Sequence, residues 1–127
     1  GIYVNGANSV QFQNSDYRLK TDVNSITDGI DKVKQLNPVY YKWKDTGDTV
    51  NTQNGFIAHE VQSVIPTLVF GEKDATIDEK GQGYQGLNYT GFTPTAIAAI
   101  KELIAKVETL EQDNIALRAR VTNLEDN

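Results

Sequence analysis

The chain contains no cysteine and a single histidine, so it offers no disulfide framework, no thiolate nucleophile and no clustered metal ligands. A chain without cysteine suits assembly in a reducing cytoplasm. It also has no apolar run near the roughly 20 residues that a membrane span requires, and no signal peptide opens it. We therefore expect no metal and no membrane partner.

Basic residues are also scarce, because 12 Lys and Arg stand against 17 Asp and Glu and leave a net charge of -5. Nucleic-acid binders need clustered Lys and Arg, whereas here the basic residues are scattered among acidic ones. We therefore expect no nucleic-acid partner. A length of 127 residues allows one ordinary domain, or a small domain with an extension.

The first segment, residues 2–12, has the pattern of a β-hairpin, with two strand-forming runs joined at Asn5-Gly6. Asn-Gly is a favoured dipeptide for a two-residue type I′ turn. So short a hairpin does not fold alone. We interpret residues 1–14 as the C-terminal end of an upstream β-rich fibre, and the pattern leaves an edge hairpin of the domain itself open as the alternative.

The following segment has the pattern of a compact α+β body, which we assign to residues 15–92. Ile26, Ile30, Val33 and Leu36 recur at helical spacing and predict a short helix that ends before Pro38. The elements expected after it are a strand over 39–44, a turn over 45–48, a strand around 56–58, a helix over 59–65 and a strand over 67–70.

Residues 71–86 are charged and rich in glycine, which predicts a protruding loop. Within it, residues 81–86 formally match the GxGxxG pattern of dinucleotide-binding loops. That motif requires a strand before it and a helix straight after it, and the surrounding pattern predicts neither. A flexible glycine loop is the favoured interpretation, and we expect no cofactor.

The last segment, residues 93–127, has the pattern of a long helix, with Thr93 as its cap, Pro94 in its first turn and no Gly or Pro afterwards. Apolar residues repeat along it with the 4-3 spacing of a coiled coil. The residues at the heptad a and d positions are Ile100, Leu103, Val107, Leu110, Asn114, Leu117, Val121 and Leu124.

Charged residues flank this heptad repeat in a complementary order. The g residue and the e residue five positions later are Lys106 with Glu111, Asp113 with Arg118, and Arg120 with Glu125. Such pairs attract between parallel helices in register, which favours self-association. A single amphipathic helix packed on its own domain is the alternative, and it explains neither these charges nor Asn114. Taken alone, β-branched a residues with Leu at d favour two strands.

Ser15 and Lys20 form a candidate nucleophile and base, because a serine hydroxyl reacts only when a base takes its proton. A spacing of five residues places the two side chains on opposite faces of a strand, and about 140° apart around a helix. A dyad therefore requires a bent segment, or a lysine supplied by a neighbouring chain.

Several ordered motifs carry a resemblance to a known family. They are Ser15-Asp16-Tyr17-Arg18-Leu19-Lys20, then Tyr41-Lys42-Trp43, then Gly55 to Val61 with Pro66 after it, and Leu87-Asn88-Tyr89 ahead of the terminal helix. Over about residues 15–124 the chain resembles the endosialidase-type intramolecular chaperone domain, peptidase family S74. This family sits at the C-terminus of bacteriophage tail fibres, tail spikes and neck appendages.

The resemblance implies a homotrimer that guides folding of the upstream β-rich fibre in the host bacterial cytoplasm and then cuts itself off before the motif serine. The parent fibre would remain in the virion. By this resemblance Ser15 is the nucleophile, Lys20 is the base, and Asn14-Ser15 is the scissile bond. The candidate supporting residues are Asp16, Arg18, Glu60 and His59, although the family often has Gln at the position of His59.

Two other kinds of function remain as alternatives. A permanent trimerisation cap would share the fold and the coiled coil but lack peptidase activity. An enzyme acting on small molecules is poorly supported, because no carboxylate pair, metal cluster or phosphate loop stands in a convincing context.

Overall fold

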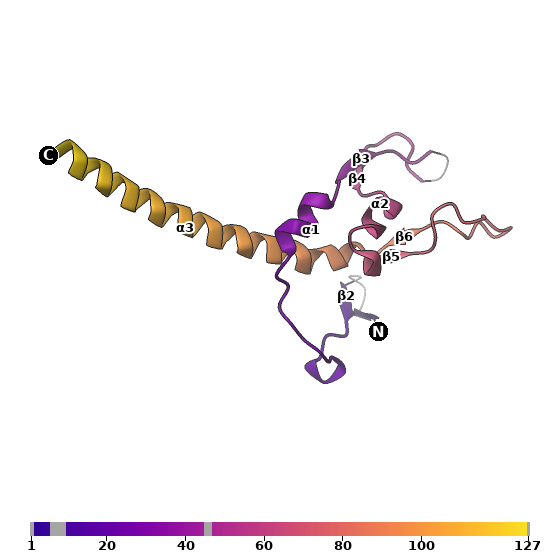
Figure 1. Cartoon of the computed structure of the whole chain (residues 1–127). Helices are drawn as coiled ribbons and strands as arrows, with labels where there is room; N and C mark the ends of the chain where they lie inside the picture. The colour runs from indigo at the N-terminus through magenta and orange to yellow at the C-terminus, as the bar shows by residue number, and fades with distance from the viewer. Residues whose placement is uncertain (1, 6–9, 45–46, 127) are drawn as a thin grey trace.

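The computed structural model describes residues 2–5, 10–44 and 47–126 of the chain. An N-terminal hairpin, a small mixed body and one long C-terminal helix follow each other along it (Figure 1). The elements are β1 (Ile2–Asn5), β2 (Val10–Gln13), α1 (Gly29–Gln35), β3 (Val39–Tyr41), β4 (Gln53–Gly55), α2 (Ala58–Gln62), β5 (Val69–Phe70), β6 (Gly86–Leu87) and α3 (Phe92–Asp126), with 3₁₀ helices at Tyr17–Leu19, Pro66–Leu68 and Tyr89–Gly91. The predicted mixture of helices and strands, with a long terminal helix, is confirmed.

Strands pair only with their neighbours in sequence, giving three two-stranded antiparallel sheets over the described ranges: β1–β2, β3–β4 and β5–β6. The predicted N-terminal hairpin is confirmed, with Ile2 opposite Gln13 and Asn5 opposite Val10. This register pairs the ends of the two strands, and the turn expected at Asn5-Gly6 extends into residues outside the described ones. Gly6 itself lies outside the described residues.

The body keeps the predicted order of helix, strand, strand, helix and strand, but two predicted strands are misplaced. The strand expected around 56–58 lies at β4 instead, because β4 pairs with β3 and Ala58 already begins α2. The strand expected over 67–70 is reduced to β5. Its first half is taken by a 3₁₀ helix, because Pro66 occupies the first helical position, where its fixed φ is favourable.

The other predicted elements of the body are longer than the observed ones. Helix α1 begins three residues after Ile26, and α2 ends at Gln62 rather than at residue 65. Strand β3 ends at Tyr41, and the turn expected over 45–48 lies partly outside the described residues.

Strands β5 and β6 form the base of an arm that extends away from the body, and this arm contains the loop predicted over 71–86 (Figure 1). Asp78 closes the tip, because its N–H donates to the Gln82 carbonyl at 2.8 Å and its Oδ1 accepts from the Gln82 N–H at 2.9 Å. Strand β6 begins at Gly86. Residues 81–86 therefore lead into a strand rather than a helix, and they lack the context of a dinucleotide loop.

Helix α3 begins at Phe92, so Thr93 lies inside its first turn and is not its cap as predicted. The Phe92 ring stacks on Phe56, with centroids 4.5 Å apart and planes 11° apart. The Tyr89 hydroxyl, in the 3₁₀ helix that leads into α3, accepts a hydrogen bond from the Phe56 N–H at 3.2 Å. This aromatic contact attaches the start of α3 to the chain that follows β4.

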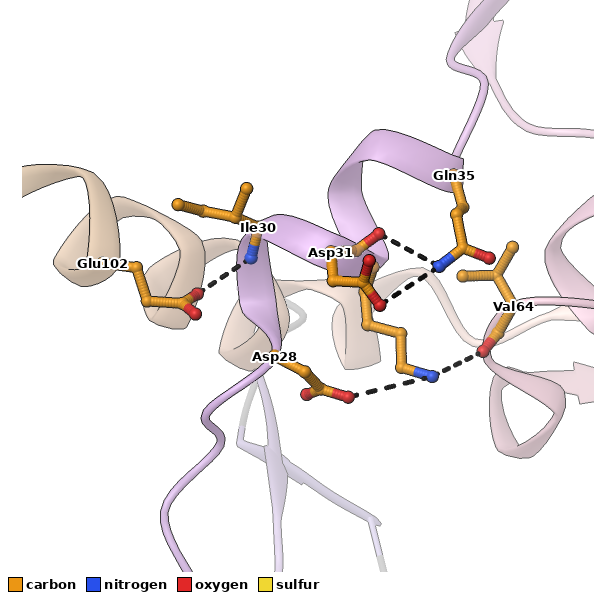
Figure 2. Close-up of polar contacts among 7 residues, drawn as sticks. Asp28, Ile30, Asp31, Gln35, Val64 and Glu102 are labelled. Atoms are coloured by element: carbon orange, nitrogen blue, oxygen red, sulfur yellow. Dashed lines mark hydrogen bonds and ion pairs between the residues drawn. The ribbon is translucent and has the colours of Figure 1, made fainter. Parts of the chain in front are cut away.

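Helix α1 crosses the N-terminal part of α3 (Figures 1 and 2). Gly29 permits a close approach, because a Cβ at this position would meet the backbone of Ala99. The Glu102 carboxylate accepts a hydrogen bond from the Ile30 N–H at 2.8 Å. A side chain of α3 therefore satisfies one of the free N–H groups in the first turn of α1.

The other side of α1 contacts the end of the α2 segment (Figure 2). The Lys32 ammonium donates to the Val64 carbonyl at 3.3 Å and lies 3.9 Å from the Asp28 carboxylate. Gln35 donates to the Asp31 carbonyl at 3.1 Å and secures the last turn of the helix. Helix α1 thus links the rest of the body to α3.

The buried core of the single chain is small. The buried apolar residues of the described chain are Val61, Val64, Leu68 and Ala99. Most other large apolar side chains stay partly or largely exposed. Because so small a core stabilises a domain of this size weakly, association is expected to bury further apolar surface.

Candidate functional site

The segment from Ser15 to Lys20 folds into a tight bend around the 3₁₀ helix Tyr17–Leu19. The Leu19 N–H donates to the Asp16 carbonyl at 3.0 Å, and the Lys20 N–H donates to the Tyr17 carbonyl at 3.2 Å. This bend reverses the chain direction locally. The Lys20 ammonium therefore reaches the Ser15 hydroxyl and donates a hydrogen bond to Oγ at 2.6 Å.

The five-residue spacing requires either a bent segment or a lysine from a neighbouring chain. The single chain adopts the bent segment. The distance lies within the range of a direct nucleophile and base contact. Ser15 and Lys20 are thus brought together by a local bend within one chain.

Asp16 and Arg18 hold this bend in place. The Asp16 carboxylate accepts from the Arg18 N–H at 2.9 Å, as a helix cap, and from the Arg18 guanidinium at 3.0 and 2.9 Å. The side-chain hydrogen bond from Arg18, followed by its backbone N–H, lowers the pKa of Asp16 below its ordinary value. The same pair raises the pKa of Arg18. Both residues face solvent, so their contribution is geometric more than energetic.

The other two candidate supporting residues lie elsewhere. His59 and Glu60 are on α2, exposed, and Figure 1 shows α2 well apart from the 15–20 bend. The Glu60 carbonyl accepts from the Ser63 hydroxyl at 2.8 Å. None of the contacts of the described residues joins His59 or Glu60 to the Ser15 and Lys20 pair within one chain.

The surroundings of the pair are open in the single chain. Tyr17 and Leu19, which lie between Ser15 and Lys20 in sequence, keep 84% and 69% of their surfaces exposed. Both are large apolar side chains without a packing partner that would bury them. They offer apolar surface beside the pair that a neighbouring molecule can cover.

The predicted coiled-coil residues lie along an uncovered face of α3. The apolar residues at the a and d positions are exposed by between 45% at Val121 and 77% at Leu124. Helix α1 instead contacts Ala98, Ala99 and Glu102, which are heptad f, g and c residues on the side away from this face. The a and d residues are therefore left free for another helix.

Three residues of this region, Glu102, Ile97 and Ile104, are not predicted from the sequence to have a role. Glu102 caps α1 across 72 residues of sequence, and no local pattern predicts such a contact. Ile97 and Ile104 occupy e positions and widen the apolar face. Their spacing of seven residues, each three before an a residue, was the signal available for them.

Among the described residues, no group of three or more His, Cys, Asp or Glu side chains is placed to hold a metal ion. No helix in the described part of the chain combines the length and the apolar character of a membrane span.

The chain combines a Ser15 to Lys20 contact with an uncovered heptad face on α3. These two features indicate an assembly domain with a candidate nucleophile. Residues 15–70 match the family described as "Chaperone of endosialidase" (Peptidase_S74). Over these residues the chain belongs to this family, and the relatives described next support a phage tail fibre chaperone domain. The family carries a chaperone role and implies peptidase activity of the self-cleaving kind.

Curated relatives agree with this assignment. The long tail fiber proteins Gp37 of Enterobacteria phages K3 and T2 are each 30% identical over 87% of this chain. Gp37 of Escherichia phage AR1 is 33% identical over 69% of it. The matched region covers 10%, 9% and 8% of these relatives, so the chain spans about a tenth of their length.

Proposed function

We propose that this chain is a homotrimeric chaperone for a β-rich phage fibre and that it releases itself by cutting the Asn14-Ser15 bond. The observation that carries the proposal is the 2.6 Å contact between the Lys20 ammonium nitrogen and Ser15 Oγ, directly after Asn14. Family membership supports the chaperone role and the type of activity. In this proposal residues 1–14 end the fibre, 15–92 form the chaperone body and 93–127 form the coiled coil.

The chemistry follows from the atoms in contact. Neutral Lys20 takes the Ser15 hydroxyl proton while Oγ attacks the Asn14 carbonyl carbon. The Asn14–Ser15 C–N bond breaks, the proton passes to the leaving nitrogen, and an ester forms between Asn14 and Oγ. Water then hydrolyses the ester, which restores the hydroxyl and leaves a carboxylate on Asn14. The attack fits one chain, and attack on a neighbouring chain is the other arrangement.

A lysine amine acts as a base only in its neutral form, which burial favours. In the single chain Lys20 is exposed, and apolar side chains that could enclose it, Tyr17 and Leu19, are exposed as well. Assembly would cover this surface. Cleavage would then be linked to completed assembly, which is the order that a chaperone released after folding requires.

The physical case for a chaperone rests on the uncovered face of α3. Intertwined β-fibres have high contact order and exposed strand edges, so they fold slowly and aggregate easily. A parallel coiled coil holds the chains in register and raises their local concentration. We place this step in the host bacterial cytoplasm, with the finished fibre retained in the virion.

The test is an intact mass spectrum of the chain during prolonged incubation at physiological temperature, beside Ser15→Ala and Lys20→Ala. Loss of residues 1–14 by the unmodified chain alone would support the dyad. If all three chains stay whole, the same comparison is repeated with a longer upstream segment. Chains that still stay whole, yet form the same oligomer, would overturn self-cleavage.

A permanent trimerisation cap is the second candidate, and the exposure of Ser15 and Lys20 favours it. It predicts that Ser15→Ala changes neither the mass of the chain nor the oligomer. Light scattering tests both candidates at once, because a monomer mass independent of concentration would exclude each of them. A dimer mass would instead follow the preference of the a and d residues.

A further inference from the structure

The uncovered apolar face of α3 is wider in its first part, because e positions there are apolar as well as the a and d positions. Ile97 and Ile104, at e positions, are 52% and 50% exposed beside the a and d residues. Ile97 also lines a mostly apolar hollow of about 630 Å³ between α3 and the segment that precedes α1, together with Ile26 and Ala105. This flank of the helix therefore exposes apolar surface that another element can cover.

The positions around the helix indicate what lies opposite this flank. In heptad order the e, b and f positions follow the a residue on one side, and the g and c positions follow the d residue on the other. The hollow is lined mainly by residues at e, b and f, whereas α1 packs against Ala98, Ala99 and Glu102 at f, g and c. The e flank of α3 therefore borders the hollow and the g flank borders α1, with Ala98 and Glu102 between them.

Parallel coiled coils place these two flanks against each other, because the g flank of one helix faces the e flank of the next. The g-to-e pairs change character along α3. The last three pairs are ionic and complementary, whereas the first two are Phe92 with Ile97 and Ala99 with Ile104. The ionic pairs set a parallel, in-register arrangement, and that arrangement carries the α1 of one chain to the hollow of its neighbour.

Helix α1 has apolar surface to offer there. Val33 lies one helical turn after Gly29, on the face of α1 that meets α3, yet it remains 44% exposed. Ile26, just before α1, remains 45% exposed and lines the hollow of its own chain. In the assembly, a neighbouring α3 would cover Val33, and a neighbouring α1 would cover Ile26.

We propose that α1 of each copy packs into the hollow on the next copy's α3 and covers Ile97 and Ile104. This proposal rests on the self-association proposed above and adds a second interface to it. The occupant is a second copy of this chain. Each body is then completed only when its neighbour is present, so folding of the bodies and pairing of the helices become one event.

The absence of cysteine allows a direct test by disulfide formation. One chain carrying Val33→Cys is refolded together with another carrying Ile97→Cys and then oxidised. A covalent pair of the two chains is expected. As the control, Ile115→Cys replaces Ile97→Cys, because Ile115 is an isoleucine of α3 that is 70% exposed and lies further along the helix, beyond the residues that line the hollow.

Glutamate variants give a second measurement that does not depend on cross-linking geometry. Ile97→Glu is expected to raise the concentration at which the oligomer dissociates by roughly tenfold or more, because it places a carboxylate in an apolar interface. Ile115→Glu is expected to leave that concentration unchanged. Sedimentation or light scattering on the full chain measures both.

The outcomes separate this interface from the function on which it rests. An oligomer with no Val33 to Ile97 cross-link, in which Ile97→Glu behaves like Ile115→Glu, overturns the α1 interface and leaves the proposed chaperone intact. A chain that stays monomeric overturns both proposals. A cross-link specific to the Ile97 pair, with selective weakening by Ile97→Glu, supports the interface.

Discussion

The two halves of α3 share one heptad spacing but have different surroundings. Residues 92–105, the body half, lie against the aromatic cluster and α1, whereas residues 106–126, the free half, extend beyond the body (Figure 1). The a and d residues named above are apolar in both halves, except for Asn114 in the free half. The flanking residues differ, because the body half has apolar e residues and the free half has complementary charges.

One helix therefore serves two kinds of contact. In the free half, no other element of the described chain packs on the helix, so its apolar face is stable only against copies of itself. In the body half, contacts with α1 already hold the helix in the single chain. The e and g residues, more than the a and d residues, therefore distinguish the half that packs on its own chain from the half that packs only on other copies.

The largest effect is expected from a charge in the free half. Leu117→Asp places an unpaired carboxylate at a d position and should cost more than about 3 kcal/mol of oligomer stability. Because most of the stability of a helix in a protein comes from packing of its apolar face, helix content should fall with the oligomer. Light scattering and far-UV circular dichroism measure the two losses.

Ile115→Asp is the matched control, two residues away at an exposed b position. It should change neither the mass nor the helix content. Equal losses in both variants would show that the free half does not associate through its a and d face.

A smaller effect, confined to the body half, is expected from Gly29→Ala. The added Cβ would meet the backbone of Ala99 and the Glu102 carboxylate, so α1 must move away from α3. Overpacking of this kind costs about 1–3 kcal/mol. The midpoint of urea denaturation should fall, whereas the free half should keep its helix content in the same sample.

Gly86→Ala is the control for this change, because a Cβ at Gly86 meets nothing within 4 Å. Equal denaturation midpoints for Gly29→Ala and Gly86→Ala would contradict the close α1–α3 contact.

Asn114 tests whether the free half also selects the number of chains. Asn114→Ile replaces a polar residue at an a position and should raise stability by roughly 1 kcal/mol while broadening the mix of oligomers. Sedimentation velocity would resolve that mix. A stabilised chain with one unchanged oligomer would count against Asn114 as the residue that sets chain number and register.

The smallest effect concerns the N-terminal bend and should disturb neither half of α3. The Arg18 side-chain hydrogen bond, followed by the Arg18 N–H, lowers the pKa of Asp16, so the pair stabilises the bend fully above the ordinary carboxyl value of about 4. This stabilisation is lost as pH falls through the lowered pKa. Carboxyl NMR titration should show a low midpoint that Arg18→Gln moves upward. Identical midpoints in both chains would exclude the ion pair in solution.

Sequence patterns predicted the parts of the structure that depend on local spacing. The hairpin, the order of body elements, the arm and the long helix follow from alternation, heptads, Gly and Pro, and each is confirmed. The predicted position of β4 and the predicted start of α3 are wrong. Pairing with β3 places β4, and stacking of Phe92 on Phe56 fixes the start of α3. Such contacts join residues far apart in sequence, and a local pattern does not contain them.

In the candidate site, too, the sequence predicts the residues but not all of their contacts. Ser15 and Lys20 were named from the motif, but their spacing alone argued against a direct contact. The 3₁₀ bend that joins them depends on Asp16 and Arg18, which the resemblance had marked only as candidate supporting residues. The capping of α1 by Glu102 had no sequence signal.

The placement of Ser15 and Lys20 within one short bend has a consequence for the direction of the proposed reaction. Cleavage before Ser15 would create a new amino terminus on that residue, and at neutral pH this group carries positive charge in part. After hydrolysis of the ester and release, this group and an exposed Lys20 ammonium would share a bend closed by a few hydrogen bonds, and their repulsion would weaken it. The cut would thereby dismantle its own catalyst, so the chain would act once and would not reseal the fibre.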